Sequence, residues 1–319
     1  MTKSSRHSLT TARRWVLKIG SAILTDNGQG LSHDFITRLA GDVIALREQG
    51  REVIIVSSGA VAAGLARLGL ETRPSALDEL QAAAAVGQSS LVQAYEAAFA
   101  PSGYLCAQIL LSHDDVKSRD RYLNARATLQ TLLDKGVIPI VNENDTVVTD
   151  EIRFGDNDTL AALVANLIDA DVLLMLTDQQ GLFNADPRTA PDATLIQQSD
   201  AHDTSLDAMV SEGSALGRGG MVSKLRAARL AAHSGALAVI ADGREAQVVR
   251  HIADGVETGT LFTTEKQPQP ARKQWLASNL YPQRKLMLDE GDVQDVSQAG
   301  RYLPPLVVTA GTGDCNRAG

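Results

Sequence analysis

Residues 52–60 of the chain read EVIIVSSGA, an unbroken apolar run followed by two serines and a glycine. Similar runs that end in small or polar residues occur at 15–21 (WVLKIGS), 137–145 (VIPIVNEND) and 172–178 (VLLMLTD). Strands that are apolar throughout are buried on both faces, which is typical of parallel sheets. Because segments with helical periodicity separate these runs, the sequence predicts an α/β fold, a three-layer αβα sandwich with a mostly parallel central sheet.

The helical segments lie between these apolar runs. One begins after Ser32, whose hydroxyl can cap the first turn; its apolar residues recur at intervals of three and four, and Gly50 ends it. Residues 147–154 could form a short hairpin. Further helices are expected at residues 77–99, 120–135, 157–167, 221–232 and about 245–253, and further strands at 105–111 and 237–241.

The composition of the chain changes near residue 263, where TTEKQPQPARKQ is polar, basic and proline-bearing, as linkers are. We therefore expect a flexible, weakly basic lead-in at 1–14, a large α/β domain at 15–262, a linker at 263–279 and a short β-rich segment at 280–319. No long apolar run follows the basic residues of the lead-in, so neither a signal peptide nor a membrane span is predicted. A cytoplasmic location is expected.

Overall composition excludes several classes of protein. The 319 residues are 44% hydrophobic, and 30 Lys+Arg against 38 Asp+Glu give a net charge of −8, so a disordered or collagen-like chain is excluded. The acidic balance argues against nucleic acids and membrane surfaces as partners of the whole chain. Cys106 and Cys315 lie far apart, and the six histidines show no ligand spacing, so neither a disulfide framework nor a zinc site is predicted.

Polar residues follow the predicted strands, and ligands of open parallel sheets bind beyond these carboxyl ends. Lys18 lies inside an apolar strand, where an unpaired charge is costly, and Gly20 after it allows close approach to the backbone. Ser58 lies between a strand and a helix, where backbone N–H groups suit an anion. Each feature also has a structural explanation, since Lys18 can reach solvent at an edge and Ser58 can simply cap the helix.

Two further clusters lie at the ends of later strands. Residues 142–145 (NEND) and 155–158 (GDND) gather acidic and amide side chains that suit an amino acid's ammonium and carboxylate, or the placement of Mg²⁺ and lysines. Thr177 and Asp178 follow a strand, and GRGGMVSK at 217–224 is a glycine-rich turn that enters a helix and suits phosphate. The structural alternatives are a solvated acidic loop and a glycine-rich turn without a ligand. The GxxxxGK[ST] motif is absent from the chain.

Taken together, these motifs resemble the amino-acid kinase family, whose fold is an αβα sandwich with a sheet of about eight strands and no P-loop. Within the family, the chain is most similar to members that phosphorylate the γ-carboxylate of L-glutamate with MgATP, the first step of proline synthesis. The motifs that carry the resemblance are VLKIGS (16–21), SSGA (57–60), AAAAVGQSSL (82–91), RYLNAR (121–126), VNENDTV (141–147), FGDNDTLAA (154–162), TDQQGLFNADPR (177–188) and GRGGMVSK (217–224).

The resemblance implies a role for each motif residue. Lys18 and Lys224 would neutralise charge on the transferred phosphoryl group, and Asp158 would hold both lysines. Ser58, Asp145 and Asn157 would bind glutamate, with Asp145 suited to its ammonium group. The resemblance further implies feedback inhibition by proline and a homo-oligomer, a dimer or tetramer. ATP would be bound by Lys18, Thr177, Asp178, Arg218, Gly219, Gly220, Met221, Val222, Ser223 and Lys224.

Two departures from the family pattern limit what can be carried over. Position 218 is Arg, where the family usually has a small Thr. Many bacterial members carry a C-terminal PUA domain, and RKLMLDEG at 284–291 resembles its first strand, but we expect 280–319 to be only a partial PUA remnant. RNA binding is therefore not expected, and neither is a metal held directly by protein ligands.

Two other functions remain open on the sequence alone. The chain could be a kinase of N-acetylglutamate or aspartate with the same fold, or a non-catalytic sensor of proline or nucleotide. Asp145 disfavours an N-acetylated substrate, which has no ammonium group to receive. The presence of both Lys18 and Lys224 disfavours a non-catalytic protein.

Overall fold

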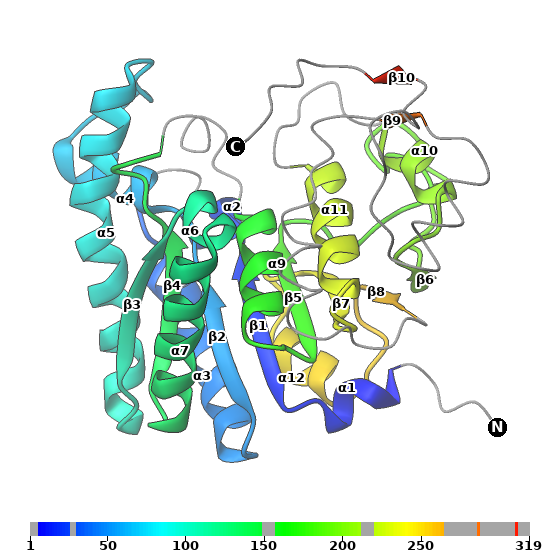
Figure 1. The fold of residues 1–319 in the computed structure, drawn as a ribbon, viewed down its shortest axis with the longest axis horizontal. Helices are drawn as coiled ribbons and strands as arrows, with labels where there is room; N and C mark the ends of the chain where they lie inside the picture. Colours follow the sequence, from blue (N-terminus) through cyan, green and yellow to red (C-terminus); the bar gives the residue numbers. More distant parts are fainter. Residues whose placement is uncertain are drawn as a thin grey trace. The chain divides into compact units, whose positions relative to one another are not determined.

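A computed structural model describes residues 6–25, 30–148, 157–211, 220–264, 286–287 and 310–311. It divides the chain into two units, Met1–Ser278 and Asn279–Gly319. The larger unit is built around one eight-stranded sheet (Figure 1). Its strands are β1 (Arg14–Ile19), β2 (Glu52–Val56), β3 (Cys106–Leu111), β4 (Ile138–Glu143), β5 (Val172–Thr177), β6 (Gln198–Asp200), β7 (Leu237–Asp242) and β8 (Thr260–Thr263).

The strand order is β3-β4-β2-β1-β5-β7-β8-β6, and every neighbouring pair is parallel except β7 and β8. The predicted α/β class with a mostly parallel sheet is confirmed. Strand β1 lies at the centre, between β2 on one side and β5 on the other. The chain order reverses direction at this strand, and such a switch point is where open parallel sheets bind ligands, beyond the carboxyl ends of the strands.

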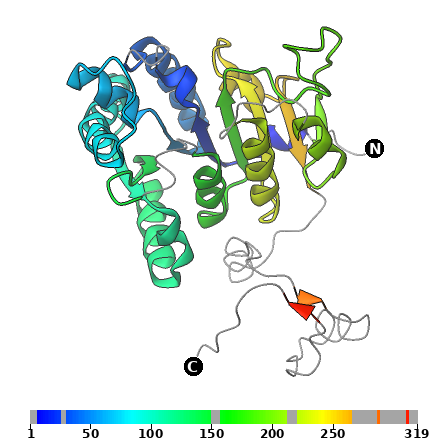
Figure 2. The same cartoon turned by 90° about the horizontal axis from the view of Figure 1, so that it is seen from above.

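Helices cover both faces of the sheet, as the view from above shows (Figure 2). Two hydrophobic clusters, one on each face, form the core. The first face packs α1 (His7–Thr11), α3 (His33–Glu48), α5 (Leu77–Phe99) and α12 (Val248–Ala253), and the second packs α7 (Arg119–Asp134), α9 (Asp158–Leu167), α10 (Ser205–Ser211) and α11 (Met221–Ala232). The remaining helices are α2 (Ser21–Leu24), α4 (Ala60–Leu68), α6 (His113–Lys117) and the 3₁₀ turn η1 (Ala100–Ser102).

The pair α4 and α5 is held unusually close by two glycines. A Cβ atom built on Gly64 would lie 1.7 Å from the backbone oxygen of Ala83, and one built on Gly87 would lie 1.8 Å from that of Ala60. Only glycine fits at either position, because real Cβ atoms do not approach backbone oxygens so closely. The contact joins the helix that follows the SSGA motif to the long helix that lies beside β3.

The N-terminal prediction is wrong for residues 6–12. Residues 7–11 form a helix, and Leu9 is fully buried in the core. Arg6 is also buried, although basic residues near a terminus are usually solvated. Its guanidinium group has five N–H donors in a fixed geometry, so it can donate hydrogen bonds to several carbonyl groups at once. Those carbonyl groups come together only in the folded chain, which is why the sequence did not predict the contact. The carbonyls that accept hydrogen bonds from Arg6 are those of Gln197, Val256, Thr258 and Gly259, at 2.9–3.1 Å.

Other differences from the sequence predictions concern short or peripheral elements. Strands β6 and β8 were not predicted, and β8 joins the sheet antiparallel to β7. Strand β3 is an edge strand, so it is only partly buried rather than covered on both faces. Most of the hairpin expected at 147–154 lies outside the described residues. Among the residues that the structure describes, no helix is long and apolar enough to span a membrane.

The smaller unit is described only at β9 (Leu286–Met287) and β10 (Ala310–Gly311), which pair antiparallel. Strand β9 lies where a first strand of this segment was expected. The linker at 263–279 and the rest of the PUA-like prediction lie almost entirely outside the described residues.

Candidate active site

A buried carboxylate and two buried lysines meet at the carboxyl end of β1. Asp158, the first residue of α9, is fully buried. Its Oδ1 atom lies 2.5 Å from Nζ of Lys18, and its Oδ2 atom lies 3.1 Å from Nζ of Lys224 in the first turn of α11. The Ser223 hydroxyl also donates a hydrogen bond to Oδ2, at 2.7 Å. The structure therefore brings together three residues that are far apart in the sequence.

The charges of Lys18, Asp158 and Lys224, here called the trio, determine which kind of ligand this part of the structure favours. Burial alone would raise the pKa of Asp158, but the adjacent Lys18 and Lys224 ammonium groups outweigh it and hold the pKa well below its usual range. Asp158 is therefore ionised at neutral pH, and the three side chains together carry one net positive charge. A buried positive charge beside the first turn of a twelve-residue helix favours an anion, because the N-terminal N–H groups of α11 add to the same field.

A polar network lies beside the trio and connects β2, β4, α5 and α9. The side-chain amide of Asn157 donates to the backbone oxygen of Ser57 at 2.5 Å and to Oδ1 of Asn142 at 2.7 Å. Asn142 in turn donates to Oε1 of Gln88 at 3.0 Å. These bonds hold Asn157 at the start of α9.

Ser58 follows β2 and is buried. Its hydroxyl donates to the backbone oxygen of Ile19, at 2.6 Å, so the end of β2 is tied to the end of β1. Gly59, the next residue, has a φ of 83°, a left-handed conformation that turns the chain into α4. The SSGA motif thus forms a tight strand-to-helix turn next to Lys18.

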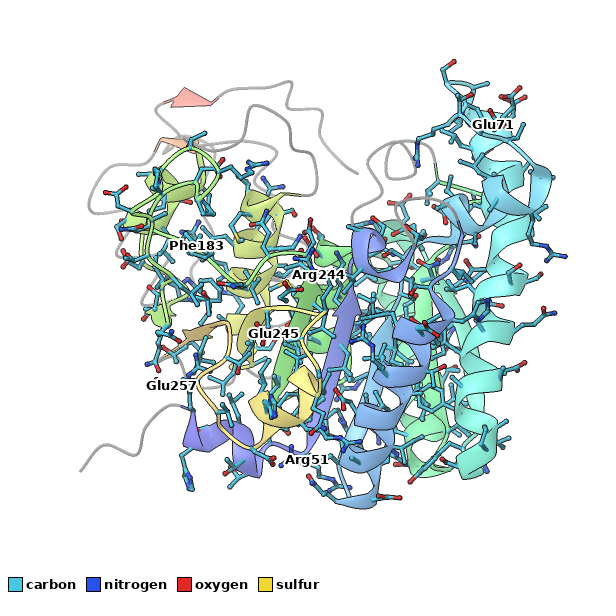
Figure 3. All side chains as sticks on the ribbon, turned by 180° about the vertical axis from the view of Figure 1, so that it is seen from behind. Arg51, Glu71, Phe183, Arg244, Glu245 and Glu257 are labelled. Carbon is cyan, nitrogen blue, oxygen red and sulfur yellow. The ribbon has the colours of Figure 1, made fainter. Side chains whose placement is uncertain are left out.

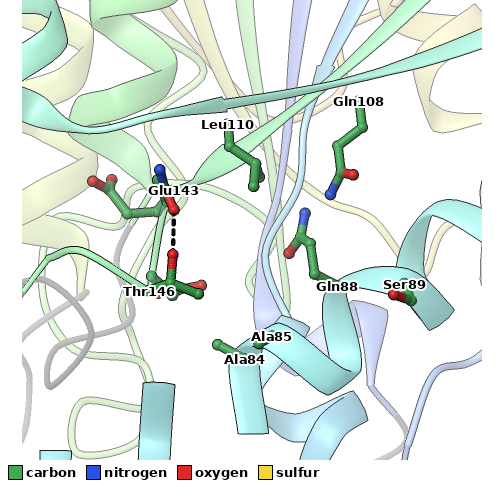
Figure 4. A pocket seen from close by; sticks show the side chains of 10 residues that line it. Ala84, Ala85, Gln88, Ser89, Gln108, Leu110, Glu143 and Thr146 are labelled. Carbon is green, nitrogen blue, oxygen red and sulfur yellow. Dashed lines mark hydrogen bonds between the residues drawn. The ribbon is translucent and has the colours of Figure 1, made fainter. Parts of the chain in front are cut away.

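A cavity of about 210 Å³ lies between α5, β3 and the residues that follow β4 (Figure 4). Burial raises the pKa of Asp145 to about 7, with a further increase from the Glu143 carboxylate and an opposing effect of Arg73. A carboxylate in this environment gains most from a cation that enters the cavity, since the cation restores its charged form. The lining residues are Ala84, Ala85, Gln88, Ser89, Gln108, Leu110, Glu143, Asn144, Asp145 and Thr146.

The residues expected to bind nucleotide lie at the end of β5 and the start of α11. Thr177 ends β5, and its hydroxyl donates to Oδ1 of Asp178 at 3.0 Å. Gly220 precedes α11, and Met221, Val222 and Ser223 form its first turn with Lys224. Arg218 and Gly219 lie outside the described residues.

Sequence reasoning missed two kinds of residue in this region. Arg244 lies just beyond β7 (Figure 3), pairs with Asp242 at 2.8 Å and donates to the backbone oxygen of Asp178. Gln88 belongs to a quoted motif but received no role, and Asn142 was predicted only as part of the cluster at 142–145. A polar residue on the buried face of the alanine-rich helix α5 was the available signal for Gln88, whereas nothing local distinguishes Arg244 from a surface arginine.

Comparison with known proteins places the chain among small-molecule kinases. Residues 13–242 match the amino acid kinase family. The chain is 56% identical over 313 residues to the glutamate 5-kinase of Nitrosococcus oceani, an alignment that covers 98% of this chain and 84% of that protein. It is 56% identical over 307 residues to the glutamate 5-kinase of Saccharophagus degradans, covering 96% of this chain and 82% of that protein.

Solved structures share the fold at much lower sequence identity. A UMP kinase from Bacillus anthracis aligns with 80% of this chain and 97% of its own, with a TM-score of 0.54 and 17% identity. A carbamate kinase from Giardia lamblia aligns with 80% of this chain and all of its own, with a TM-score of 0.57 and 17% identity. These similarities concern the architecture of the sandwich.

Proposed function

The chain belongs to the amino acid kinase family, and from this premise we propose how it acts on its substrate. It transfers the γ-phosphoryl group of ATP to the side-chain carboxylate of L-glutamate and forms L-glutamyl 5-phosphate, the first step of proline biosynthesis. The observation that carries the proposal is the identity of 56% to glutamate 5-kinases along nearly the whole chain. The placement of Lys18, Asp158 and Lys224 supports it.

The chemistry needs little from the protein beyond positioning and charge. The acceptor carboxylate of glutamate is ionised at neutral pH, with a pKa of about 4, so no general base is required. Charge develops on the transferred phosphoryl group, and Lys18 and Lys224 lie where they can neutralise it from two sides. Asp158 holds both ammonium groups in place, and the trio keeps one positive charge for the phosphates.

The cavity beside Asp145 takes the amino-acid end of glutamate. We place the substrate's ammonium at Asp145, whose burial makes a cation favourable there. Ser58 is hydrogen-bonded to Ile19, next to Lys18, and Asn157 precedes Asp158 and is linked to Gln88 of the cavity through Asn142. We assign Ser58 and Asn157 to the substrate's carboxylate groups. A substrate that spans from Asp145 to Lys18 then presents its far carboxylate to the phosphoryl group. Proline carries the same ammonium and α-carboxylate, and we propose that it inhibits at the same cavity.

ATP occupies the side of the site formed by Thr177, Asp178 and the start of α11. Its magnesium ion belongs to the substrate MgATP. Among the described residues, no group of three or more His, Cys, Asp or Glu side chains could hold a metal. The Asp158 oxygens already face two lysines, so Asp158 is not a ready metal ligand. Magnesium bound mainly through phosphates and waters fits this donor set.

An assay of ADP release tests the proposed function. With saturating MgATP, we expect turnover with L-glutamate and little with N-acetylglutamate or aspartate, because the first lacks the ammonium group and the second is one methylene shorter. Hydroxylamine should trap the product as a hydroxamate, since an acyl phosphate reacts with it. Added proline should raise the KM for glutamate. Absence of turnover with glutamate, or faster turnover with N-acetylglutamate, would contradict the proposal.

A further inference from the structure

Glu143, the last residue of β4, is a buried carboxylate close to Asp145. Its side chain is 4% exposed, and neither carboxylate oxygen accepts a hydrogen bond from any residue that the structure describes. Burying a carboxylate without hydrogen bonds costs several kcal/mol unless a nearby positive charge compensates it. The presence of Glu143 at this point therefore calls for a function.

The nearest charged partner of Glu143 is a histidine. Side chains alternate along a strand, so Asn142 faces α5 and Gln88, whereas Glu143 faces the opposite side of the sheet. Figure 4 shows the Glu143 carboxylate turned away from Gln88. On that opposite side, Nδ1 of His113, the first residue of α6, lies 3.6 Å from Oε2 of Glu143. His113 is largely buried, with 18% of its side chain exposed.

The His113–Glu143 pair lies close in the sequence to Asp145, the residue that we assign to the substrate's ammonium. Asp145 follows Glu143 by two residues, and the negative charge of Glu143 disfavours a second charge on Asp145. A proton on His113 compensates Glu143 and so relieves Asp145. An imidazole ordinarily gains its proton near a pH of about 6.5, the range in which Asp145 also titrates.

We propose that His113 and Glu143 are positioning residues for Asp145: a proton on His113 offsets the Glu143 carboxylate, so that Asp145 keeps the charge that binds the substrate's ammonium at a lower pH than it would beside Glu143 alone. The inference rests on the proposed function, because Asp145 must receive the ammonium group for the pair to matter. Glu143 borders the cavity that we assign to the substrate, but neither residue is assigned to bind it. Their effect reaches it only through the charge on Asp145.

Other charged groups near the pair have separate partners or act on Asp145 from elsewhere. Asp115 in α6 accepts hydrogen bonds from the backbone and hydroxyl of Ser112 and pairs with Arg121 of α7 at 2.9 Å. Asp114 follows His113 in α6, and Arg73, from the α4–α5 connection, acts on Asp145 directly. Asp158 of α9 is compensated by its two lysines.

The test is the pH dependence of kcat/KM for glutamate at saturating MgATP, which reports the ionisation of the free enzyme. His113→Gln removes the compensating charge. The fall of kcat/KM on the acid side of the pH profile, the acid limb, should therefore move to higher pH by about 0.5–1 unit. This shift equals about a three- to tenfold loss of kcat/KM near pH 6.5 and almost none near pH 8.5. His113→Lys keeps a positive charge at every pH and should move the limb the other way.

Glu143→Gln supplies the decisive comparison, because it removes the charge that His113 compensates. Its acid limb should lie at lower pH than that of the wild type, and the double variant should follow Glu143→Gln. KM for ATP and the unfolding temperature of each variant serve as controls. An unshifted profile in His113→Gln, or a loss that is equal at all pH values, would overturn the inference. Absence of glutamate turnover in the wild type would instead reject the proposed function.

Discussion

Lys18 on strand β1 and Lys224 on helix α11 both contact the carboxylate of Asp158. A substitution of Lys224 therefore tests the contribution of one of the two positive charges to catalysis. Lys224→Ala should lower kcat by about 10³-fold, since removal of one charge-stabilising donor typically costs that much. The KM for glutamate should change little, because its binding residues lie elsewhere. Lys135→Ala, at an exposed position, is the matched control and should leave kcat unchanged. Near-normal turnover of the Lys224 variant would remove that residue from the mechanism.

The ionisation of Asp145 should affect both the free energy of unfolding and the proposed binding of glutamate. Folded Asp145 keeps its proton up to a pH of about 7, whereas the unfolded chain loses it near about pH 4. The folded state therefore binds more protons between these values, and the free energy of unfolding falls as the pH rises through this window. Asp145→Asn should remove that fall and gain about 1–3 kcal/mol relative to the wild type at pH 8, measured by urea unfolding. It should also greatly weaken glutamate binding.

The control for this prediction is the same comparison near about pH 4. Wild-type Asp145 is protonated there in the folded state, so the stability advantage of the Asn variant should largely disappear. An equal advantage at both pH values would mean that the gain comes from packing rather than from charge.

Individual site residues were predictable where a polar side chain interrupts an apolar pattern. Lys18 inside WVLKI and Asp158 at a helix start are such interruptions, and the structure brings them into contact. The His113–Glu143 pair was not predictable, because His113 shows no local motif and only the register of β3 beside β4 brings the two side chains together.

At the scale of elements, the structure predicts opposite effects for two helical glycines, one at the contact between α4 and α5 and one in α3. Gly64→Ala should destabilise the protein by about 3 kcal/mol or more, because its methyl group would meet the Ala83 carbonyl oxygen. Gly41→Ala in α3 meets only an arginine nitrogen at 3.8 Å. It should stabilise the protein by about 0.5–1 kcal/mol, the usual gain of alanine over glycine inside a helix. Thermal and urea unfolding of the two variants measure the difference.

Elements that carry their own pattern were predicted, often to the residue. Strand β2 and helix α5 have the predicted bounds, because an unbroken apolar run and a long alanine-rich period are local signals. Strands β6 and β8 have only three and four residues and are fixed by pairing with distant partners. Their sequences alone contain too little information to assign them.

At the scale of the whole molecule, Arg6 ties the N-terminal helix to chain segments 191 to 253 residues away. Arg6→Ala would leave several carbonyl groups without their donors and should cost about 2–4 kcal/mol of unfolding free energy. Arg13→Ala is the matched control, since its side chain is 74% exposed and its ion pair with Glu52 should contribute about 1 kcal/mol or less. Equal losses in both variants would contradict this function of Arg6 in the fold.

The two glycines between α4 and α5 also restrict how this enzyme can change over generations of mutation. Each faces backbone atoms of the other helix, and no substitution can remove a backbone oxygen. A larger residue at position 64 or 87 therefore has no compensating partner elsewhere in the chain, and the helices can only separate. Since α5 carries Ala84 and Ala85 in the cavity wall, their separation would also change the shape of the cavity that we propose for the substrate.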